Sequence, residues 1–339
     1  MNASADNSPL HEPNTKEQVL SSLEKEKGAF VSGGALAREL SVSRNSIWKA
    51  INALRDEGYG IENITGKGYR LRPETSVLSA ASIDHYLSDP RIKVEYHDSI
   101  GSTNTRAKEL AETGAPEGTL VVANEQTAGK GRQGRPFYSP SGTGVYFTLV
   151  LRPDFQLSDI TLVTTLSACC IARAIDEIFD AHAQIKWVND VFVDGHKVSG
   201  ILTEASIDAE RARATYLVVG IGINVFEPEE GFPDEAGRSA SAICSAHGDT
   251  DDLRARLVAR VIDLFIEGYD KLPAHEHLDE YRSRSLLDGR DVTVYEGNET
   301  YRAHVIGIND DFTLAVRLSN GERRDLSFGE VHIPSSQLT

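Results

Sequence analysis

The sequence predicts an α+β multidomain protein, in which a helical module with a β-hairpin precedes a mixed α/β domain and a small β-barrel. Three observations support this prediction. Helical periodicity stops near residue 58 and gives way to two short strand-like runs, residues 77–285 mix helical and strand patterns, and residues 288–333 hold only short alternating runs. A chain of 339 residues is also too long for one small domain. The predicted domains are residues 1–74, 75–286 and 287–339.

The composition is that of an ordinary soluble globular protein, with 40% hydrophobic and 25% charged residues. Residues 1–14 are polar and lack the apolar core of a signal peptide, and no run approaches the roughly 18–20 apolar residues of a membrane span. The cysteines, Cys169, Cys170 and Cys244, have neither disulfide-framework nor zinc-ligand spacing. We therefore expect a cytoplasmic protein without a metal site built from its side chains.

The first module is predicted to be a winged helix-turn-helix. Helical patterns cover residues 15–27, with Gly28 as the expected stop, then 35–40, then 44–58, where Ser43 is a good N-cap. Residues 60–73 form two short strands around a turn at Gly66 and Gly68. The third helix has an apolar stripe spaced by three and four residues, made of Ile47, Ala50, Ile51 and Leu54.

The charge of this module indicates a polyanionic partner. The whole chain has a formal net charge of −16, but residues 35–72 hold seven basic and four acidic side chains, a local charge of +3. In a winged helix-turn-helix the third helix enters the major groove and the hairpin touches phosphates. The predicted DNA-binding residues are Arg44, Asn45, Lys49, Asn52 and Lys67. Trp48 is expected to pack inside the module, and the alternative is a module that only docks on the next domain.

The central domain is predicted from four strand-like runs, one strand pair and two helices. The runs cover residues 93–100, 119–126, 145–153 and 216–225, and residues 185–206 form two strands around an Asp194-Gly195 turn. Helical patterns cover residues 102–114 and the mostly apolar residues 159–179.

One loop of this domain concentrates cations and glycines. The stretch AGKGRQGRPFYSPSGTGVYF, residues 128–147, interleaves Lys130, Arg132 and Arg135 with glycines between two buried strands. Glycines let backbone N–H groups approach an anion while the side chains supply charge. Neither the P-loop nor the dinucleotide-binding glycine pattern is present. We predict a small-molecule phosphate or carboxylate site, with an RNA-contacting loop or a surface turn as alternatives.

The C-terminal residues 288–333 are predicted to form an SH3-like β-barrel, because short alternating strands are joined by Gly297-Asn298 and Asn320-Gly321 turns. A structural cap on the central domain and a contribution to nucleotide and partner binding both remain open for this barrel. The preceding His275, Glu276 and His277 are expected to lie in a solvated helix segment without metal.

Four sequence segments together resemble the biotin protein ligases. They are GKGRQGRPFYSP, VYFTLVLRP, KWVNDVFVDGHKVSGILTE and GIGIN. With the helix-turn-helix in front, the chain resembles the bifunctional ligases that also repress biotin synthesis genes, over roughly residues 15–333. The resemblance implies a central domain of the biotin/lipoate ligase type.

The resemblance also implies a two-step reaction. Biotin, the substrate, attacks the α-phosphorus of ATP with Mg²⁺ present, giving biotinyl-5′-AMP and pyrophosphate, and a lysine of a carrier protein then displaces AMP. The implied partners are a biotin carboxyl carrier protein or domain of a biotin-dependent carboxylase, operator DNA and, by analogy, a second copy of the adenylate-bound chain. The alternatives are a biotin-sensing repressor without ligase activity and a ligase that has lost its operator.

The family's functional residues are carried over only onto matching positions. The implied catalytic residues are Arg132, Lys197 and Asp190. The implied biotin-binding residues are Ser102, Thr103, Asn104, Gln126, Lys130, Gly131, Arg132 and Lys197. The implied ATP- and adenylate-binding residues are Arg132, Arg135, Phe137, Asn189 and Asn224. Without the resemblance, residues 102–104 could be an ordinary helix cap, and Lys197, Asn189 and Asp190 ordinary turn residues.

Three positions depart from the family pattern. Lys130 replaces an arginine, which keeps the charge but loses bidentate geometry. Phe137 replaces a tryptophan and offers less area for stacking on adenine, and Val188 replaces a proline. These departures bear on the affinity for ATP rather than on the reaction.

Overall fold

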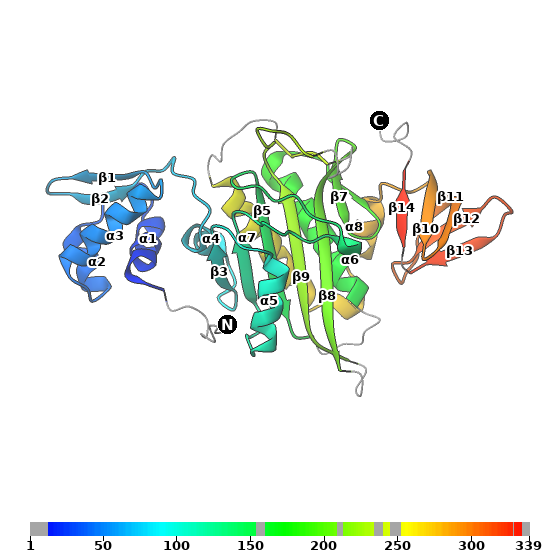
Figure 1. Cartoon of the computed structure of the whole chain (residues 1–339), viewed down its shortest axis with the longest axis horizontal. Helices are drawn as coiled ribbons and strands as arrows, with labels where there is room; N and C mark the ends of the chain where they lie inside the picture. The colour runs from blue at the N-terminus through cyan, green and yellow to red at the C-terminus, as the bar shows by residue number, and fades with distance from the viewer. Residues whose placement is uncertain are drawn as a thin grey trace, which may run out of the picture.

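The computed structural model describes residues 13–153, 160–208, 213–233, 240–244, 252–327 and 329–333. Figure 1 shows an N-terminal helical module, a central sheet flanked by helices, and a C-terminal β-domain arranged in a row. This arrangement confirms the predicted α+β fold class.

The N-terminal module is a winged helix-turn-helix with a core of its own. Its elements are α1 (Thr15–Lys25), α2 (Gly33–Glu39), α3 (Arg44–Asp56), β1 (Ile61–Ile64) and β2 (Gly68–Leu71), and β1 pairs antiparallel with β2. Ser43 caps α3 as predicted, because its hydroxyl accepts from the backbone N–H of Ser46 at 3.0 Å. The predicted stripe of α3 is buried together with Val19, Leu20, Leu23, Leu36, Tyr59, Ile61 and Leu71. The first helix ends two residues before its predicted end, and Gly28 lies beyond it with φ +86°.

Trp48 corrects one prediction. We expected it to pack inside the module, but its side chain is 55% exposed. It lies on α3 one turn after Arg44 and one turn before Asn52, on the polar side of the helix rather than on the buried stripe.

The central domain is built on a seven-stranded sheet in the order β3-β4-β5-β9-β8-β7-β6. The strands are β3 (Lys93–His97), β4 (Thr119–Ala123), β5 (Gly144–Leu151), β6 (Gln184–Lys186), β7 (Asp190–Val193), β8 (His196–Asp208) and β9 (Arg213–Asn224). Among the described strands of this sheet, β3 and β4 form the one parallel pair, and the other neighbouring strands are antiparallel.

The helices cover the two faces of this sheet unequally (Figure 1). They are α4 (Ala80–Tyr86), α5 (Thr103–Glu112), α6 (Ile160–Phe179), α7 (Leu253–Tyr269) and the short α8 (Leu278–Ser283). The long apolar α6 packs with α7 over one face, whereas α5 lies alone on the other. Within the described ranges no helix has the length and apolarity needed to cross a bilayer.

Strand β9 lacks side chains on part of the face that α5 covers. Its residues Leu217, Val219, Ile221 and Ile223 alternate into the large core with α6 and α7. The intervening Tyr216 and Val218 pack with α5, but the next two positions on that face are Gly220 and Gly222. The absence of side chains at these two positions of β9 leaves space that Asn104 and Phe137 fill.

The C-terminal domain is a five-stranded antiparallel sheet in the order β13-β12-β11-β10-β14, which agrees with the predicted SH3-like barrel. Its strands are β10 (Asp291–Glu296), β11 (Glu299–Ile308), β12 (Leu314–Leu318), β13 (Arg323–Leu326) and β14 (Glu330–His332). The buried Phe312 joins it to the central domain, because the indole N–H of Trp187 donates to the Phe312 carbonyl at 2.9 Å and the Tyr281 ring meets the Phe312 ring edge-on.

His277 corrects a second prediction. The segment of His275, Glu276 and His277 was expected to be solvated, but His277 is only 8% exposed. Its ring stacks on Phe312 with centroids 4.7 Å apart, and its Nε2 lies 2.9 Å from the hydroxyl of Thr165 on α6. Burial lowers the pKa of His277 to about 4, so the ring is neutral at physiological pH.

Candidate active site

The predicted biotin-binding residues at the start of α5 lie together in a buried polar cluster. The backbone N–H and the hydroxyl of Thr103 donate to Gln126 Oε1 at 2.9 and 3.1 Å. The Nε2 of Gln126 donates to the Ser139 hydroxyl at 3.0 Å, and the Thr148 hydroxyl lies 2.8 Å from Thr103 Oγ1. Residues from α5, β5 and two loops thus form one network on the α5 face of the sheet.

Ser102 is the N-cap residue of α5, but its side chain makes no capping hydrogen bond. Its hydroxyl is buried and has no hydrogen-bond partner among the described residues. A buried hydroxyl without a partner costs free energy, so a ligand or an ordered water at this position would compensate it. Helix capping therefore does not account for this serine.

Asn104 packs against the glycine-lined part of the sheet. Its Nδ2 donates to the Leu202 carbonyl at 3.2 Å and to Glu204 Oε2 at 3.0 Å, and the Thr148 hydroxyl donates to its Oδ1 at 2.8 Å. A Cβ at Gly220 would lie 1.8 Å from that Oδ1, so only glycine allows this packing. The result is a site floor in which amide and hydroxyl groups are held rigidly.

The cation-rich loop, residues 128–140, is an ordered turn rather than an open coil. The Gly131 N–H donates to the Arg135 carbonyl at 2.7 Å, and the Phe137 N–H donates to the Gly129 carbonyl at 2.9 Å. A short 3₁₀ turn covers Arg132–Gly134, where Gln133 has φ +57°. The loop therefore has a defined resting shape that projects its cations in different directions.

The three cations of this loop contact three different elements. Lys130 is exposed, and its Nζ donates to the Thr105 hydroxyl on α5 at 2.8 Å. Arg132 donates to Asn189 Oδ1 at 2.8 Å and to the Gly329 carbonyl at 3.3 Å. Arg135 forms a bidentate pair with Glu330 of β14 at 2.6 and 2.7 Å. The loop thus bridges α5, the central sheet and the C-terminal domain.

The Arg135–Glu330 pair shifts the pKa of both partners. The guanidinium of Arg135 lowers the pKa of the Glu330 carboxyl, and the same hydrogen bonds raise the pKa of Arg135. Both groups are therefore charged at neutral pH. The loop and the C-terminal strand are joined by an ion pair that a phosphate could displace.

Two strand residues place a lysine beside a carboxylate. The Lys197 Nζ on β8 lies 2.6 Å from Asp190 Oδ1 on β7, and both side chains are partly buried. Lys186 pairs with Asp190 in the β6–β7 register, and burial lowers the pKa of its ammonium group. Lys197 is thus the lysine that forms an ion pair with Asp190, and Lys186 lies opposite Asp190 on the neighbouring strand.

The two predicted asparagines are fixed by the sheet. The Nδ2 of Asn189 donates to the Ile201 carbonyl at 2.9 Å, which leaves its Oδ1 to accept from Arg132. The Nδ2 of Asn224, at the end of β9, donates to the Ser241 carbonyl at 3.1 Å. Both side chains are 8% exposed, so they are positioned groups rather than mobile surface amides.

Phe137 lies against the glycines of the sheet. A Cβ at Gly222 would come within 2.4 Å of its ring, and a Cβ at Gly200 within 3.4 Å. Its ring also meets Tyr146 edge-on, with centroids 6.4 Å apart. The loop thus supplies an aromatic wall over the glycine-lined floor.

A cavity of about 530 Å³ lies beside these contacts, between the cation-rich loop and the C-terminal domain. It is lined by Arg132, Gln133, Arg135, Tyr295, Gly297, Gly329 and Glu330. Arg135 is paired with Glu330 in this cavity, whereas the contacts of Arg132 are with an amide oxygen and a carbonyl, so Arg132 supplies positive charge for an anion.

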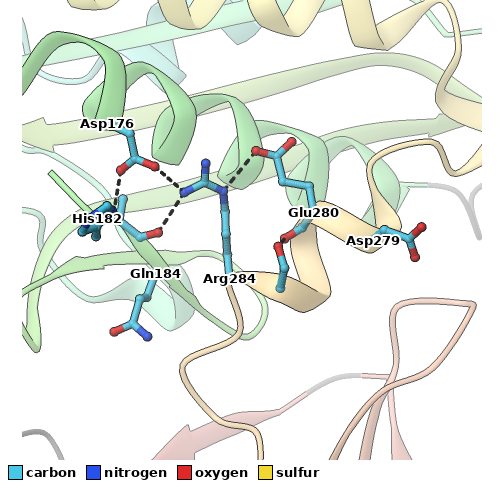
Figure 2. Close-up of a pocket in the computed structure, with 8 residues that line it drawn as sticks. Asp176, His182, Gln184, Asp279, Glu280 and Arg284 are labelled. Atoms are coloured by element: carbon cyan, nitrogen blue, oxygen red, sulfur yellow. Dashed lines mark hydrogen bonds and ion pairs between the residues drawn. The ribbon is translucent and has the colours of Figure 1, made fainter. Parts of the chain in front are cut away.

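A second cavity, of about 590 Å³, lies between α6, β6 and α8 (Figure 2). Its only arginine, Arg284, donates to Asp176 at 2.7 Å and to Glu280 at 3.0 Å, as Figure 2 shows. The charge of Arg284 is therefore already neutralised by the protein. None of the predicted site residues lies among the described residues that line this cavity.

The structure thus brings the predicted ligand residues of the central domain into one region, whereas the predicted DNA-binding residues lie apart on the N-terminal module (Figure 1). Sequence reasoning missed several neighbours of the site: Thr148, Lys186, Gly200, Glu204 and Glu330. Period-two alternation along residues 144–151 could have indicated Thr148, a polar residue in an apolar strand. No local signal indicates Glu330, which lies 195 positions from Arg135 in the sequence.

Comparisons with known proteins find relatives of both the N-terminal module and the central domain. The model of the biotin/lipoate A/B protein ligase family matches residues 96–224, and a helix-turn-helix domain model matches residues 15–70. The chain is 36% identical over 300 residues to the bifunctional ligase/repressor BirA of Bacillus subtilis, covering 87% of this chain and 91% of that protein. It is 31% identical over 202 residues to the Escherichia coli bifunctional ligase/repressor BirA, covering 58% of this chain and 60% of that one.

A solved structure shares the fold of much of the chain. The biotin protein ligase from Aquifex aeolicus in complex with biotin and ATP superposes with a TM-score of 0.58 at 28% identity. The match covers 71% of this chain and 98% of that one.

Proposed function

The chain belongs to the family of bifunctional biotin ligase/repressors, and from this premise we propose that it joins biotin to a lysine of a biotin carboxyl carrier protein and represses transcription. The ligation uses ATP and forms AMP. The observation that supports the ligase function most strongly is the position of a rigid neutral polar cluster beside a cation-rich loop on one glycine-lined face of the sheet. Biotin has a neutral polar ureido ring at one end and a carboxylate at the other.

We assign the ureido end to the polar cluster. Ser102, Thr103, Asn104 and Gln126 offer both donors and acceptors, as a ureido group requires. The buried hydroxyl of Ser102 has no partner among the described residues, so a hydrogen bond to a polar ligand would favour binding there. The carboxylate end then points toward the loop, where Lys130, the backbone of Gly131 and Arg132 are placed to receive it.

In the first step a carboxylate oxygen of biotin attacks the α-phosphorus of ATP. The bond from that phosphorus to the bridging oxygen breaks, and pyrophosphate leaves with the electron pair. Because both reactants are anions, positive charge must offset their repulsion and the charge that develops on the phosphorus oxygens. We assign this role to Arg132 and Lys197, with Arg135 on the outer phosphates and Phe137 against the adenine.

In the second step the amine of the carrier lysine attacks the acyl carbon of biotinyl-5′-AMP, and AMP leaves. The amine must lose a proton during this attack, and Asp190 is the carboxylate of the site that can accept it. The ion pair with Lys197 positions Asp190. Asn189 keeps Arg132 in place through its 2.8 Å hydrogen bond.

Mg²⁺ would accompany ATP and bind mainly to phosphate oxygens, where it adds positive charge to the transition state. On the protein side Asn224 would hold it, because its Nδ2 donates to the Ser241 carbonyl and its amide oxygen can serve as an oxygen ligand for this hard cation. We therefore propose Asn224 for the nucleotide and its ion.

The repressor function rests on the N-terminal module. Arg44, Asn45 and Lys49 are exposed on α3, and Lys67 is exposed at the tip of the wing. These are the groups that contact bases and phosphates in a winged helix-turn-helix. We further propose that the adenylate-bound chain forms a homodimer on its operator and acts in the cytoplasm, where carboxylases and DNA are both accessible.

The test is transfer of biotin to a purified carrier domain, followed by intact-protein mass spectrometry. The proposal predicts one biotin added to the carrier lysine, dependent on ATP and Mg²⁺, and no addition to a carrier whose target lysine is replaced by arginine. Binding of biotin without any transfer would favour the alternative, a biotin-sensing repressor without ligase activity.

A further inference from the structure

Trp48 is the largest of the exposed apolar side chains in the described part of the chain, and neither the winged-helix core nor the ligase site explains its position. It is 55% exposed, whereas the other tryptophan, Trp187, is 5% exposed and donates its indole N–H to the Phe312 carbonyl. No hydrogen bond or ring contact of Trp48 is found among the described residues. An indole in water has both an unburied apolar face and a donor without a protein acceptor.

The position of Trp48 on α3 places it at the centre of the predicted DNA-contact residues. Arg44 and Asn45 precede it by four and three residues, and Asn52 follows it by four. Positions with these spacings are neighbours on one helix face. The buried stripe, from Ile47 to Leu54, lies on the other side of the helix. Trp48 is therefore flanked on both sides along the helix by groups that can reach base edges.

The surrounding charge favours duplex DNA over a protein as the occupant of this face. Arg44 and Lys49 are exposed beside Trp48, and Lys67 is exposed on the wing. Residues 35–72 carry +3, so a symmetric contact of this face with the same face of a second copy would bring like charges together. A polyanion is the complementary surface.

We propose that Trp48 is a specificity-determining DNA contact, whose indole packs in the major groove against the C5-methyl group of a thymine. The inference rests on the repressor function proposed above. Arginine and lysine contacts to phosphates carry no sequence information by themselves, whereas an apolar contact to a thymine methyl distinguishes that base from cytosine. Trp48 thus adds sequence discrimination to a helix whose other contacts are polar.

The first experiment selects binding sites from a pool of random-sequence duplexes with the full-length protein, biotin and ATP. The wild type is expected to enrich one motif. Trp48→Ala is expected to weaken binding to that motif about 10- to 100-fold and to relax the preference at one base pair. The salt dependence of binding should stay unchanged, because no phosphate contact is lost. Lys49→Ala should instead weaken binding to all sequences and reduce the salt slope by about one.

The second experiment replaces thymines of the selected motif by uracil one at a time, which removes only the methyl group. One replacement should weaken binding of the wild type and leave binding of Trp48→Ala unaffected. Ile207→Ala serves as the control, because Ile207 is 54% exposed on β8 in the ligase domain and should not influence DNA binding.

Fluorescence gives a readout that does not depend on the stability of an alanine variant. The chain has two tryptophans, so the emission of the wild type minus that of Trp48→Phe isolates Trp48. The selected duplex should shift this emission to the blue and protect it from acrylamide.

Three results would overturn the inference. The first is that Trp48→Ala binds with the affinity and the motif of the wild type. The second is that the emission of Trp48 does not change when the duplex binds. The third is that Trp48→Ala loses self-association or ligation but keeps DNA binding. If the wild type selects no motif at all, the repressor function fails and the inference fails with it.

Discussion

The substitution Gly220→Ala tests the biotin end of the site through its tightest packing contact. A Cβ at Gly220 would lie 1.8 Å from Asn104 Oδ1, a distance that no relaxation of the backbone absorbs cheaply. Asn104 must therefore leave its position. The fold should survive, because the collision is with a polar side chain at the edge of the site and not with the core.

The expected magnitude follows from the contacts that Asn104 loses. It has hydrogen bonds with Thr148 at 2.8 Å, Glu204 at 3.0 Å and Leu202 at 3.2 Å. Each of these hydrogen bonds contributes about 1 kcal/mol, and water replaces part of what is lost. Restoring the position of Asn104 when biotin binds then costs about 2 kcal/mol of binding free energy. We therefore predict that the Kd for biotin rises about 30-fold.

Isothermal titration of biotin into wild type and Gly220→Ala measures this change directly. Gly101→Ala is the matched control, because a Cβ there meets nothing within 4 Å and Gly101 has no positive φ. It should bind biotin as the wild type does. If folded Gly220→Ala kept the wild-type affinity, Asn104 would not contact the ligand and our assignment of the polar cluster would be wrong.

Three further substitutions probe the loop, the catalytic pair and the junction between the first two domains. Glu330→Gln removes the charge that holds Arg135. Because Arg135 is exposed and its partner only half-buried, we expect a loss of about 0.5–1 kcal/mol, seen as a two- to five-fold faster escape of biotinyl-5′-AMP. No change in escape would argue against the contact. Lys197→Ala should lower kcat for adenylate formation about 10²–10³-fold with little change in melting temperature, and a full rate in single-turnover kinetics would remove Lys197 from the mechanism. Glu24 is 2% exposed near Lys27 and the start of α7, and burial raises the pKa of its carboxyl from 4.5 to about 7. The raised pKa of Glu24 therefore contributes fully to the free energy of unfolding below pH 4.5, and this contribution, about 3 kcal/mol in all, is lost as the pH rises through 7. Glu24→Gln should flatten the fall in stability between these pH values. Parallel stability profiles for the two proteins would contradict the raised pKa.

The sequence predicted the elements well where local signals were strong. The stripe of α3 and its Ser43 cap, the hairpin, and the strands on both sides of the cation-rich loop follow from periodicity and turn chemistry. The end of α1 was wrong by two residues, because a local pattern does not show where the chain must turn to pack.

Two residues show how assumptions about residue type mislead. Trp48 was assigned to the core because it is large and apolar, although its spacing from Arg44 and Asn52 places it on the polar face. His277 was assigned to solvent because its neighbours are polar, although the ring of Phe312, 35 positions later in the chain, covers it. In the first case periodicity was informative, whereas in the second only tertiary structure could correct the prediction.

The site itself was recognisable from sequence only in part. The cations of the loop stand out by composition, but the partners of its two arginines, Asn189, Gly329 and Glu330, come from distant parts of the chain. The role of Gly220 and Gly222 depends on which face of β9 they occupy relative to α5, and this requires the sheet order. Strand pairing over long sequence separations therefore creates the parts of the site that a local pattern cannot show.

The most direct test of the account is biotin-dependent exchange of labelled pyrophosphate into ATP, measured for the wild type, Arg132→Ala and the control Arg38→Ala. Arg38 is an exposed arginine on α2, away from the site. We predict exchange by the wild type and by Arg38→Ala, and a loss of about 10²–10³-fold for a folded Arg132→Ala. Exchange by Arg132→Ala at the wild-type rate would contradict the claim that the cation-rich loop neutralises the reacting phosphate.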